Sequence, residues 1–125
     1  MTNTILIVED EASLLEMLST ALHGKGYEAL GAEDGLQAVE TYKRLSQKID
    51  LVLLNTGLPK LGGAEVFRML KEINPGVKVI FLSGYFDNEL KSHLLREGAI
   101  HFIQKPYNTN EVLERIREAL DAGNQ

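Results

Sequence analysis

The sequence predicts an α/β domain in which helices cover both faces of a parallel sheet. Short apolar runs alternate with segments of helical periodicity from one end of the chain to the other, without a Pro- or Ser-rich linker between them. The run at 51–54 consists of consecutive aliphatic residues, which is typical of a strand buried on both faces. The chain has 125 residues, enough for one domain that buries about two-thirds of its unfolded surface. We therefore expect a single domain over residues 1–125.

The strands are expected where short apolar runs stand between turn-forming residues. These runs cover 4–8, 27–32, 50–55, 77–83 and 100–104. A segment with helical spacing follows each run, and strands joined in this way pair in parallel through right-handed crossovers. The five repeats leave no residues for a second domain.

Apolar stripes at helical spacing identify the first and third helices. The first stripe comprises Leu14, Leu15, Met17, Leu18, Ala21 and Leu22, and the second comprises Val66, Met69, Leu70 and Ile73. Both methionines in these stripes, Met17 and Met69, are therefore expected in the core.

Capping residues predict where the helices begin and end. Ser13 with Glu16 and Asn108 with Glu111 match the capping box that begins a helix, and the last helix is expected over 109–122. The residues expected to end helices are Gly24 and Gly26 for the first and Asn74-Pro75-Gly76 for the third.

Composition excludes several classes of partner. The net charge of -5 and the pI near 5.2 give no positive field that would attract nucleic acid or an anionic membrane. The absence of cysteine removes disulfide and thiolate chemistry and fits a reducing compartment. The apolar runs are shorter than a membrane span, and the N-terminus enters a strand without a basic signal region. We expect a cytoplasmic protein that binds neither nucleic acid nor membrane.

An acidic triplet, Glu9-Asp10-Glu11, follows the first strand. A nucleotide- or flavin-binding protein would place Gly, Ser or Thr there to meet phosphate. Three carboxylates instead favour a hard divalent cation such as Mg²⁺ with oxygen ligands. The alternative is that acidic residues simply favour the first turn of a helix. The histidines have no ligand-like spacing, so a zinc site is not expected.

Polar residues also end the later strands. Asn55 ends the third strand, Ser83-Gly84 the fourth and Lys105-Pro106 the fifth. A lysine can bind a phosphoryl oxygen and a hydroxyl can donate to an oxyanion, although each residue alone also fits an ordinary turn. Because the carboxyl ends of parallel strands share one edge of the sheet, these side chains are expected to converge.

In this combination the chain resembles the receiver domain of two-component response regulators over essentially its whole length. The matching residues are Glu9-Asp10, Leu58-Pro59, Gly63, Ser83-Gly84 and Lys105-Pro106. The resemblance implies a doubly wound sheet in the order 2-1-3-4-5 flanked by five helices. It also implies Mg²⁺-dependent transfer of a phosphoryl group from a kinase phosphohistidine to an aspartate that ends the third strand.

The resemblance assigns expected roles to the residues at this edge. Glu9, Asp10, the residue at position 55 and the backbone carbonyl of Gly57 would bind Mg²⁺. The Ser83 hydroxyl and the Lys105 ammonium would bind the phosphoryl group. Phe102 occupies an aromatic position that often reorients in the family, and the Lys105–Pro106 peptide is expected to be cis. The implied partners are a histidine kinase or phosphotransfer protein, with an output domain or self-association through the last two helices.

Asn55 is the departure from the family pattern. Its amide is neutral and its nitrogen lone pair is delocalised, so it lacks the charged nucleophile that forms an acyl phosphate. We expect no phosphorylation at position 55 and weaker Mg²⁺ binding, because the pocket loses one of its carboxylates. An engineered Asp-to-Asn substitution and a natural origin both remain open, as does a sequencing or deamidation ambiguity.

Three functions compete on the sequence alone. The first is a phosphorylation-controlled receiver that carries a non-phosphorylatable residue in this version. The second is a natural pseudo-receiver that acts as a phosphate-independent interaction module. The third, a flavin-binding protein of the same architecture, is disfavoured by the acidic loop after the first strand.

Overall fold

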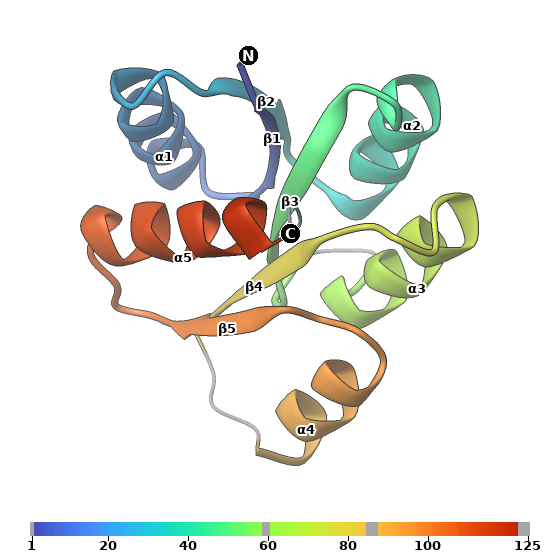
Figure 1. The fold of residues 1–125 in the computed structure, drawn as a ribbon. Helices are drawn as coiled ribbons and strands as arrows, with labels where there is room; N and C mark the ends of the chain where they lie inside the picture. Colours follow the sequence, from blue (N-terminus) through green and yellow to red (C-terminus); the bar gives the residue numbers. More distant parts are fainter. Residues whose placement is uncertain (1, 59–60, 85–87, 123–125) are drawn as a thin grey trace.

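The computed structural model describes residues 2–58, 61–84 and 88–122, in which strands and helices alternate throughout (Figure 1). Pro59, one of the residues that carry the resemblance to receiver domains, lies outside the described residues. The elements are β1 (Thr4–Val8), α1 (Ala12–Gly24), β2 (Glu28–Ala32), α2 (Gly35–Leu45), β3 (Ile49–Asn55), α3 (Gly63–Ile73), β4 (Val79–Ser83), α4 (Asn88–Arg96), β5 (His101–Gln104) and α5 (Thr109–Ala122). The expected strands and the last helix are confirmed to within two residues at each end.

The five strands form one parallel sheet in the order β2-β1-β3-β4-β5. This order confirms the doubly wound topology. The register aligns the strand ends: Val8 pairs with Leu54 across β1 and β3, and Asn55 pairs with Leu82 across β3 and β4. The carboxyl ends of β1, β3, β4 and β5 therefore meet at one edge of the sheet.

Helices cover the two faces of the sheet unequally. Helices α2, α3 and α4 pack on one face, and α1 and α5 pack on the other (Figure 1). Alternate residues of each central strand enter the two cores: Leu54 faces the first and Leu53 the second. Every residue of β1 and β4 is buried, which explains why these strands read as continuous apolar runs.

Most of the expected helix boundaries are confirmed. The Asn108 side chain accepts a hydrogen bond from the Glu111 backbone N–H at 2.8 Å and so caps α5. Helix α1 ends at Gly24, and Gly26 adopts a φ of 86°, which glycine reaches without steric cost. Asn74 is the residue at which α3 ends.

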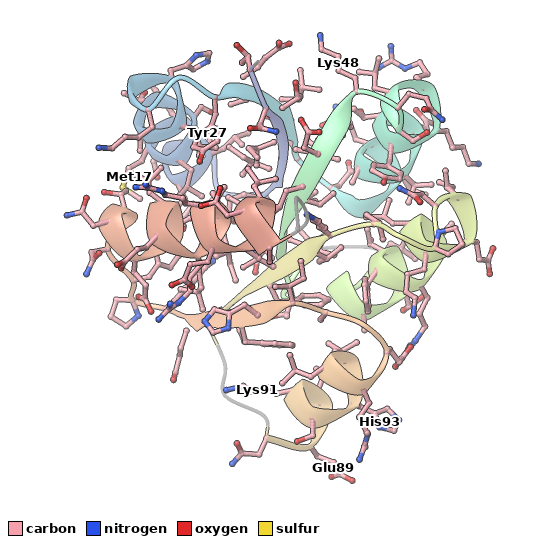
Figure 2. The ribbon with its side chains drawn as sticks, in the orientation of Figure 1. Met17, Tyr27, Lys48, Glu89, Lys91 and His93 are labelled. Carbon is pink, nitrogen blue, oxygen red and sulfur yellow. The ribbon has the colours of Figure 1, made fainter. Side chains whose placement is uncertain are left out.

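Two expectations about α1 are wrong. The helix begins at Ala12, so Ser13 lies inside it, and the N-cap residue Glu11 makes no side-chain capping bond. The Glu11 backbone N–H instead donates to the Glu9 carboxylate at 3.2 Å, so a residue of the preceding loop satisfies it. Met17 is 39% exposed and so lies at the surface and not in the core (Figure 2). Met69 does pack against the core as expected.

Candidate functional site

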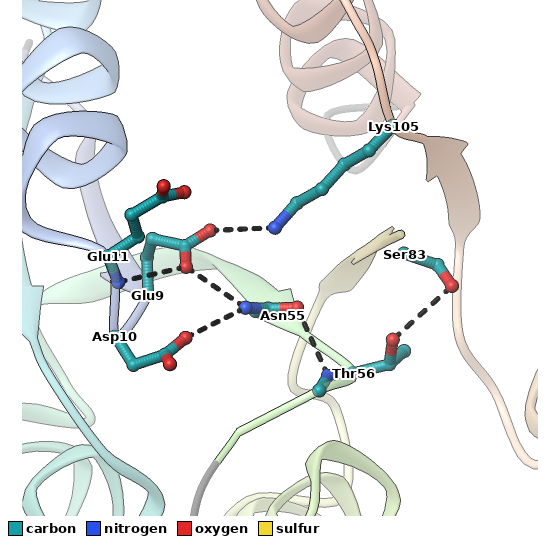
Figure 3. A network of polar contacts seen from close by, with 8 residues as sticks. Glu9, Asp10, Glu11, Asn55, Thr56, Ser83 and Lys105 are labelled. Carbon is teal, nitrogen blue, oxygen red and sulfur yellow. Dashed lines mark hydrogen bonds and ion pairs between the residues drawn. The ribbon is translucent and has the colours of Figure 1, made fainter. Parts of the chain in front are cut away.

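Four strand ends bring the expected site residues together (Figure 3). Glu9 and Asp10 follow β1, Asn55 and Ser83 are the last residues of β3 and β4, and Lys105 follows β5. An open cavity of about 600 Å³ lies over this edge of the sheet. Its lining consists of Glu9, Asp10, Glu11, Asn55, Thr56, Gly57, Gly84 and Lys105. The convergence expected from the strand order is therefore present in the structure.

Glu9 is a buried carboxylate with both of its oxygens hydrogen-bonded. It is 1% exposed. Its Oε1 accepts from Lys105 Nζ at 3.2 Å, and its Oε2 accepts from Asn55 Nδ2 at 3.0 Å and from the Glu11 backbone N–H at 3.2 Å. A buried charge is tolerated when it is paired and hydrogen-bonded in this way. Glu9 thus links the ends of β1, β3 and β5.

Asn55 is 5% exposed, and its amide lies between the acidic pair and the loop that follows β3. Its Nδ2 donates to Glu9 Oε2 at 3.0 Å and to Asp10 Oδ1 at 3.2 Å. Its Oδ1 accepts from the Gly57 backbone N–H at 3.1 Å. Carboxylates only accept hydrogen bonds and a backbone N–H only donates, so the surroundings specify which end of the amide faces which group.

Ser83 ends β4 and is buried beside the site. The Thr56 hydroxyl donates to the Ser83 hydroxyl oxygen at 3.3 Å (Figure 3). Among the described residues, the cavity lining includes Gly84 and not Ser83 itself. Thr56 was not singled out from the sequence, although a hydroxyl residue directly after a strand end is a signal that could have identified it.

The start of α3 packs directly against the end of β3. A Cβ added to Gly63 would lie 2.7 Å from the Asn55 carbonyl oxygen and 2.8 Å from Thr56 Cα. Real Cβ atoms do not approach other atoms this closely, so only glycine fits at position 63 without a shift of the backbone. The missing side chain at Gly63 therefore allows the start of α3 to pack against Asn55 and Thr56.

Tyr107 lies beside the site and was missed by the sequence reasoning. Its hydroxyl is buried and has no hydrogen-bond partner among the described residues. Burial, together with the nearby charges of Glu9 and Glu11, raises the pKa of Tyr107 to about 12. The unpaired hydroxyl depends on how α1 and α5 pack together, which no local sequence pattern shows.

The donor set fits a hard cation only in part. Glu9 and Asp10 supply carboxylate oxygens, and the Gly57 carbonyl is a further candidate oxygen ligand. The Asn55 amide, however, turns its nitrogen and not its oxygen toward the acidic pair. Within residues 2–58, 61–84 and 88–122, no three His, Cys, Asp or Glu side chains form a group that could hold a metal. The metal-binding role expected for position 55 stays a prediction, and in this arrangement the amide nitrogen, which is not a ligand for a hard cation, faces the acidic pair.

One other feature expected from the resemblance is present. The Lys105–Pro106 peptide is cis. Phe102 is partly buried and stacks on Phe81, with 4.9 Å between the ring centroids.

In the described part of the chain, no helix is both long and apolar enough to cross a membrane.

Comparison with known proteins places the chain in a large group of similar sequences. The family described as the response regulator receiver domain matches residues 5–117. Chemotaxis protein CheY of Treponema pallidum is 33% identical over 117 residues, which cover 93% of this chain and 81% of that protein. The DNA-binding response regulator MtrA of Mycobacterium tuberculosis is 37% identical over 120 residues.

Several curated relatives are longer proteins. The matched residues cover 96% of this chain and 51% of MtrA. The sensor kinase CckA of Brucella abortus is 29% identical over 118 residues, which cover 94% of this chain and 12% of the kinase. The chain thus spans about half the length of one of these relatives and a smaller part of the other.

Solved structures share the fold. A response regulator receiver domain protein from Clostridium thermocellum superposes with a TM-score of 0.92 at 27% identity, covering 98% of this chain and 97% of the other. CheY in a CheX–CheY–BeF3–Mg²⁺ complex from Borrelia burgdorferi superposes with a TM-score of 0.89 at 30% identity, covering 93% and 87%. The agreement extends over nearly the whole of each chain.

Proposed function

Because the chain belongs to the response regulator receiver domain family of two-component signalling, we propose that it is a phosphorelay receiver held in its unphosphorylated form. With aspartate at position 55 it would accept a phosphoryl group from a histidine kinase or phosphotransfer protein. With Asn55 it does not. The observation that carries this proposal is the cluster at the carboxyl edge of the sheet, where residue 55 contacts Glu9 and Asp10 and Lys105 pairs with Glu9.

The chemistry of position 55 explains why the chain with Asn55 would not accept a phosphoryl group. Phosphoryl transfer depends mainly on positioning and on electrostatic stabilisation, so the attacking group must come from the acceptor itself. A carboxylate supplies a negative charge and a free lone pair, whereas the Asn55 amide supplies neither. The Lys105 ammonium and the Ser83 hydroxyl would bind the phosphoryl oxygens in the form with aspartate. Neither of them replaces a nucleophile.

Mg²⁺ is the proposed cofactor of the form with aspartate. The CheY complex from Borrelia burgdorferi contains Mg²⁺ with BeF3, and the carboxylates of Glu9 and Asp10 supply the oxygen ligands that such a cation prefers. The Gly57 carbonyl is the proposed third ligand from this chain. When bound, Mg²⁺ would neutralise charge on the phosphoryl oxygens. Asn55 removes one negative charge from this pocket, and we expect weaker binding.

The proposed partners follow from the family and from its longer members. A histidine kinase or a phosphotransfer protein would supply the phosphoryl group. An output domain, or a second copy of the chain, would contact α4 and α5, whose surface carries both charges. Arg96 and Glu118 are exposed, and Lys91, Glu111 and Arg115 are partly exposed. Curated relatives such as MtrA, roughly twice as long, are consistent with a receiver joined to such a domain.

The test is phosphorylation by a small donor. The chain and its Asn55→Asp variant are incubated with acetyl phosphate and Mg²⁺ and examined by intact-protein and peptide mass spectrometry. The proposal predicts an adduct on residue 55 in the variant and none on Asn55. A phosphoryl group mapped to Asn55 would overturn it.

A constitutive interaction module is the second candidate. It is favoured by one observation: the Asn55 amide donates to both acidic side chains, so the pocket has an internal hydrogen-bond network that needs no phosphoryl chemistry. The same experiment separates the two candidates. A pseudo-receiver whose pocket no longer supports the chemistry would take up no phosphate as Asn55→Asp, whereas a receiver blocked only at residue 55 would take it up.

A further inference from the structure

The Asn55 amide occupies the acidic pocket in a specific orientation. One amide nitrogen donates to two carboxylates that belong to different residues, Glu9 and Asp10. The amide oxygen accepts from the Gly57 backbone N–H on its other side. Rotating the amide by 180° would set its oxygen against two carboxylates and its N–H groups against a backbone N–H. Three favourable contacts would become three repulsive ones.

We propose that Asn55 acts as an internal substitute for the divalent cation, holding the acidic pair together through its N–H donors and competing with Mg²⁺ for that pair. This inference rests on the proposed function, because it concerns the same pocket. It differs from the expectation that Asn55 is itself a weak ligand. A ligand assists metal binding, whereas a competitor opposes it.

Groups of this chain partly compensate the negative charges of the pocket. Lys105 neutralises Glu9 through Oε1, and the Asn55 N–H groups stabilise the remaining charge on Glu9 and Asp10. Hydrogen bonds to charged acceptors are stronger than those between neutral groups. Both oxygens of Glu9 therefore have partners without a metal ion, even though Glu9 is 1% exposed. The pocket should keep its arrangement in the presence of a chelator.

A cation that used both carboxylates would have to displace the amide. The displaced N–H groups would lose two charged acceptors, and Gly57 would lose its acceptor unless the oxygen kept its place. Mg²⁺ binding should therefore be weak for two separate reasons. One carboxylate is missing, and the two that remain are already engaged by Asn55.

Replacing Asn55 by alanine distinguishes an amide that competes with Mg²⁺ from an amide that binds it. Mg²⁺ affinity is measured by isothermal titration calorimetry for the chain, for Asn55→Ala and for Asn55→Asp. If the amide competes, Asn55→Ala should bind Mg²⁺ about fivefold more tightly than the chain does, since charge-assisted bonds no longer hold the free pocket. Equal or weaker binding by Asn55→Ala would overturn the proposal.

A second measurement uses the unchanged chain and so does not depend on how the variant folds. The side-chain NH₂ protons of Asn55 are followed by ¹⁵N-edited NMR with EDTA and then with increasing Mg²⁺. We expect slow exchange with water in EDTA and loss of that protection as Mg²⁺ saturates. The side-chain NH₂ of Asn74, which donates to Tyr42 Oη at the far edge of the sheet, is the internal control and should not change. Rapid exchange of the Asn55 protons in EDTA would contradict the proposal.

The outcomes distinguish this inference from the proposed function. Phosphate uptake by Asn55→Asp with no gain of Mg²⁺ affinity in Asn55→Ala would leave the receiver function standing and overturn the competing role of the amide. A gain of affinity in Asn55→Ala without phosphate uptake by Asn55→Asp would do the reverse.

Discussion

Glu9 is a buried carboxylate whose partners come from separate parts of the chain. Lys105 arrives from the end of β5, Asn55 from the end of β3, and the Glu11 N–H from the next turn of the chain. A second ion pair, Lys48–Glu28, has a shorter distance of 2.9 Å, but its side chains are 52% and 41% exposed. Burial and not distance should therefore decide which pair matters for stability.

Replacing Lys105 should destabilise the fold more than replacing Lys48. Lys105→Met leaves the buried Glu9 charge without its cation and should lower the free energy of unfolding by about 2 kcal/mol. Lys48→Met, the matched control, breaks a solvated pair and should cost less than about 1 kcal/mol. Urea denaturation at pH 7 measures both variants. Equal losses in the two would contradict the account of the Glu9 network.

Removing the Tyr107 hydroxyl should not destabilise the native state at pH 7. Because it has no hydrogen-bond partner among the described residues, Tyr107→Phe should leave the free energy of unfolding at pH 7 unchanged to within about 0.5 kcal/mol or raise it. Tyr42→Phe is the control, since Tyr42 Oη accepts from Asn74 at 3.0 Å. That variant should lose about 1 kcal/mol. A larger loss for Tyr107→Phe than for Tyr42→Phe would show that the hydroxyl is bonded.

The same tyrosine predicts an alkaline dependence of stability. Its pKa of about 12 in the folded chain lies above the value of about 10 in an unfolded chain. Between these values the unfolded state loses the proton first, so Tyr107 contributes stability that declines as the pH rises above about 10. Tyr107→Phe should therefore flatten the fall in unfolding free energy over this range. Parallel curves for the two proteins would contradict the burial of the hydroxyl.

At the scale of elements, the junction of β3 and α3 depends on a close backbone approach. Gly63→Ala would place a methyl group 2.7 Å from the Asn55 carbonyl oxygen and should cost about 2 kcal/mol. Gly24→Ala is the matched control, because a Cβ there meets nothing within 4 Å and alanine favours the helix that Gly24 ends. Thermal unfolding compares the stabilities of the two variants. Similar stabilities of Gly63→Ala and Gly24→Ala would show that α3 can move away from β3 without a loss of stability.

The two helix starts predicted from capping boxes provide a paired test. Asn108→Ala removes the bond to the Glu111 N–H and should cost about 1 kcal/mol. Ser13→Ala should cost nothing measurable, because Ser13 lies within α1 and does not cap it. Chemical denaturation of both variants is the measurement. A loss in Ser13→Ala equal to that in Asn108→Ala would restore the original prediction for α1.

At the scale of the whole molecule, the sequence was sufficient for the fold because its strands are buried on both faces. The continuous apolar residues of β1, β3 and β4 identified a parallel sheet, and the resemblance supplied the strand order that the structure confirms. The polar residues at the strand ends then located the site, since that topology brings strand ends to one edge.

The remaining features depend on side-chain packing across elements. The orientation of the Asn55 amide and the Thr56–Ser83 contact involve residues far apart in the sequence. The Tyr107 hydroxyl is buried by packing between elements and has no partner among the described residues. The capping pattern at Ser13 was present, but α1 begins earlier, at Ala12, where the Glu11 carbonyl accepts from the Leu15 N–H at 3.0 Å. Local patterns could not reveal which of the two arrangements is more stable.

The central claim is that residue 55 alone separates this chain from a working phosphoryl acceptor. The most direct measurement compares Asn55→Asp with the double variant Asn55→Asp/Lys105→Met after incubation with acetyl phosphate and Mg²⁺, using mass spectrometry to map the adduct. We predict phosphorylation at residue 55 in the single variant and at least about tenfold slower uptake in the double variant, which lacks the ammonium group. No phosphorylation of the single variant, provided that it is folded, would contradict the claim.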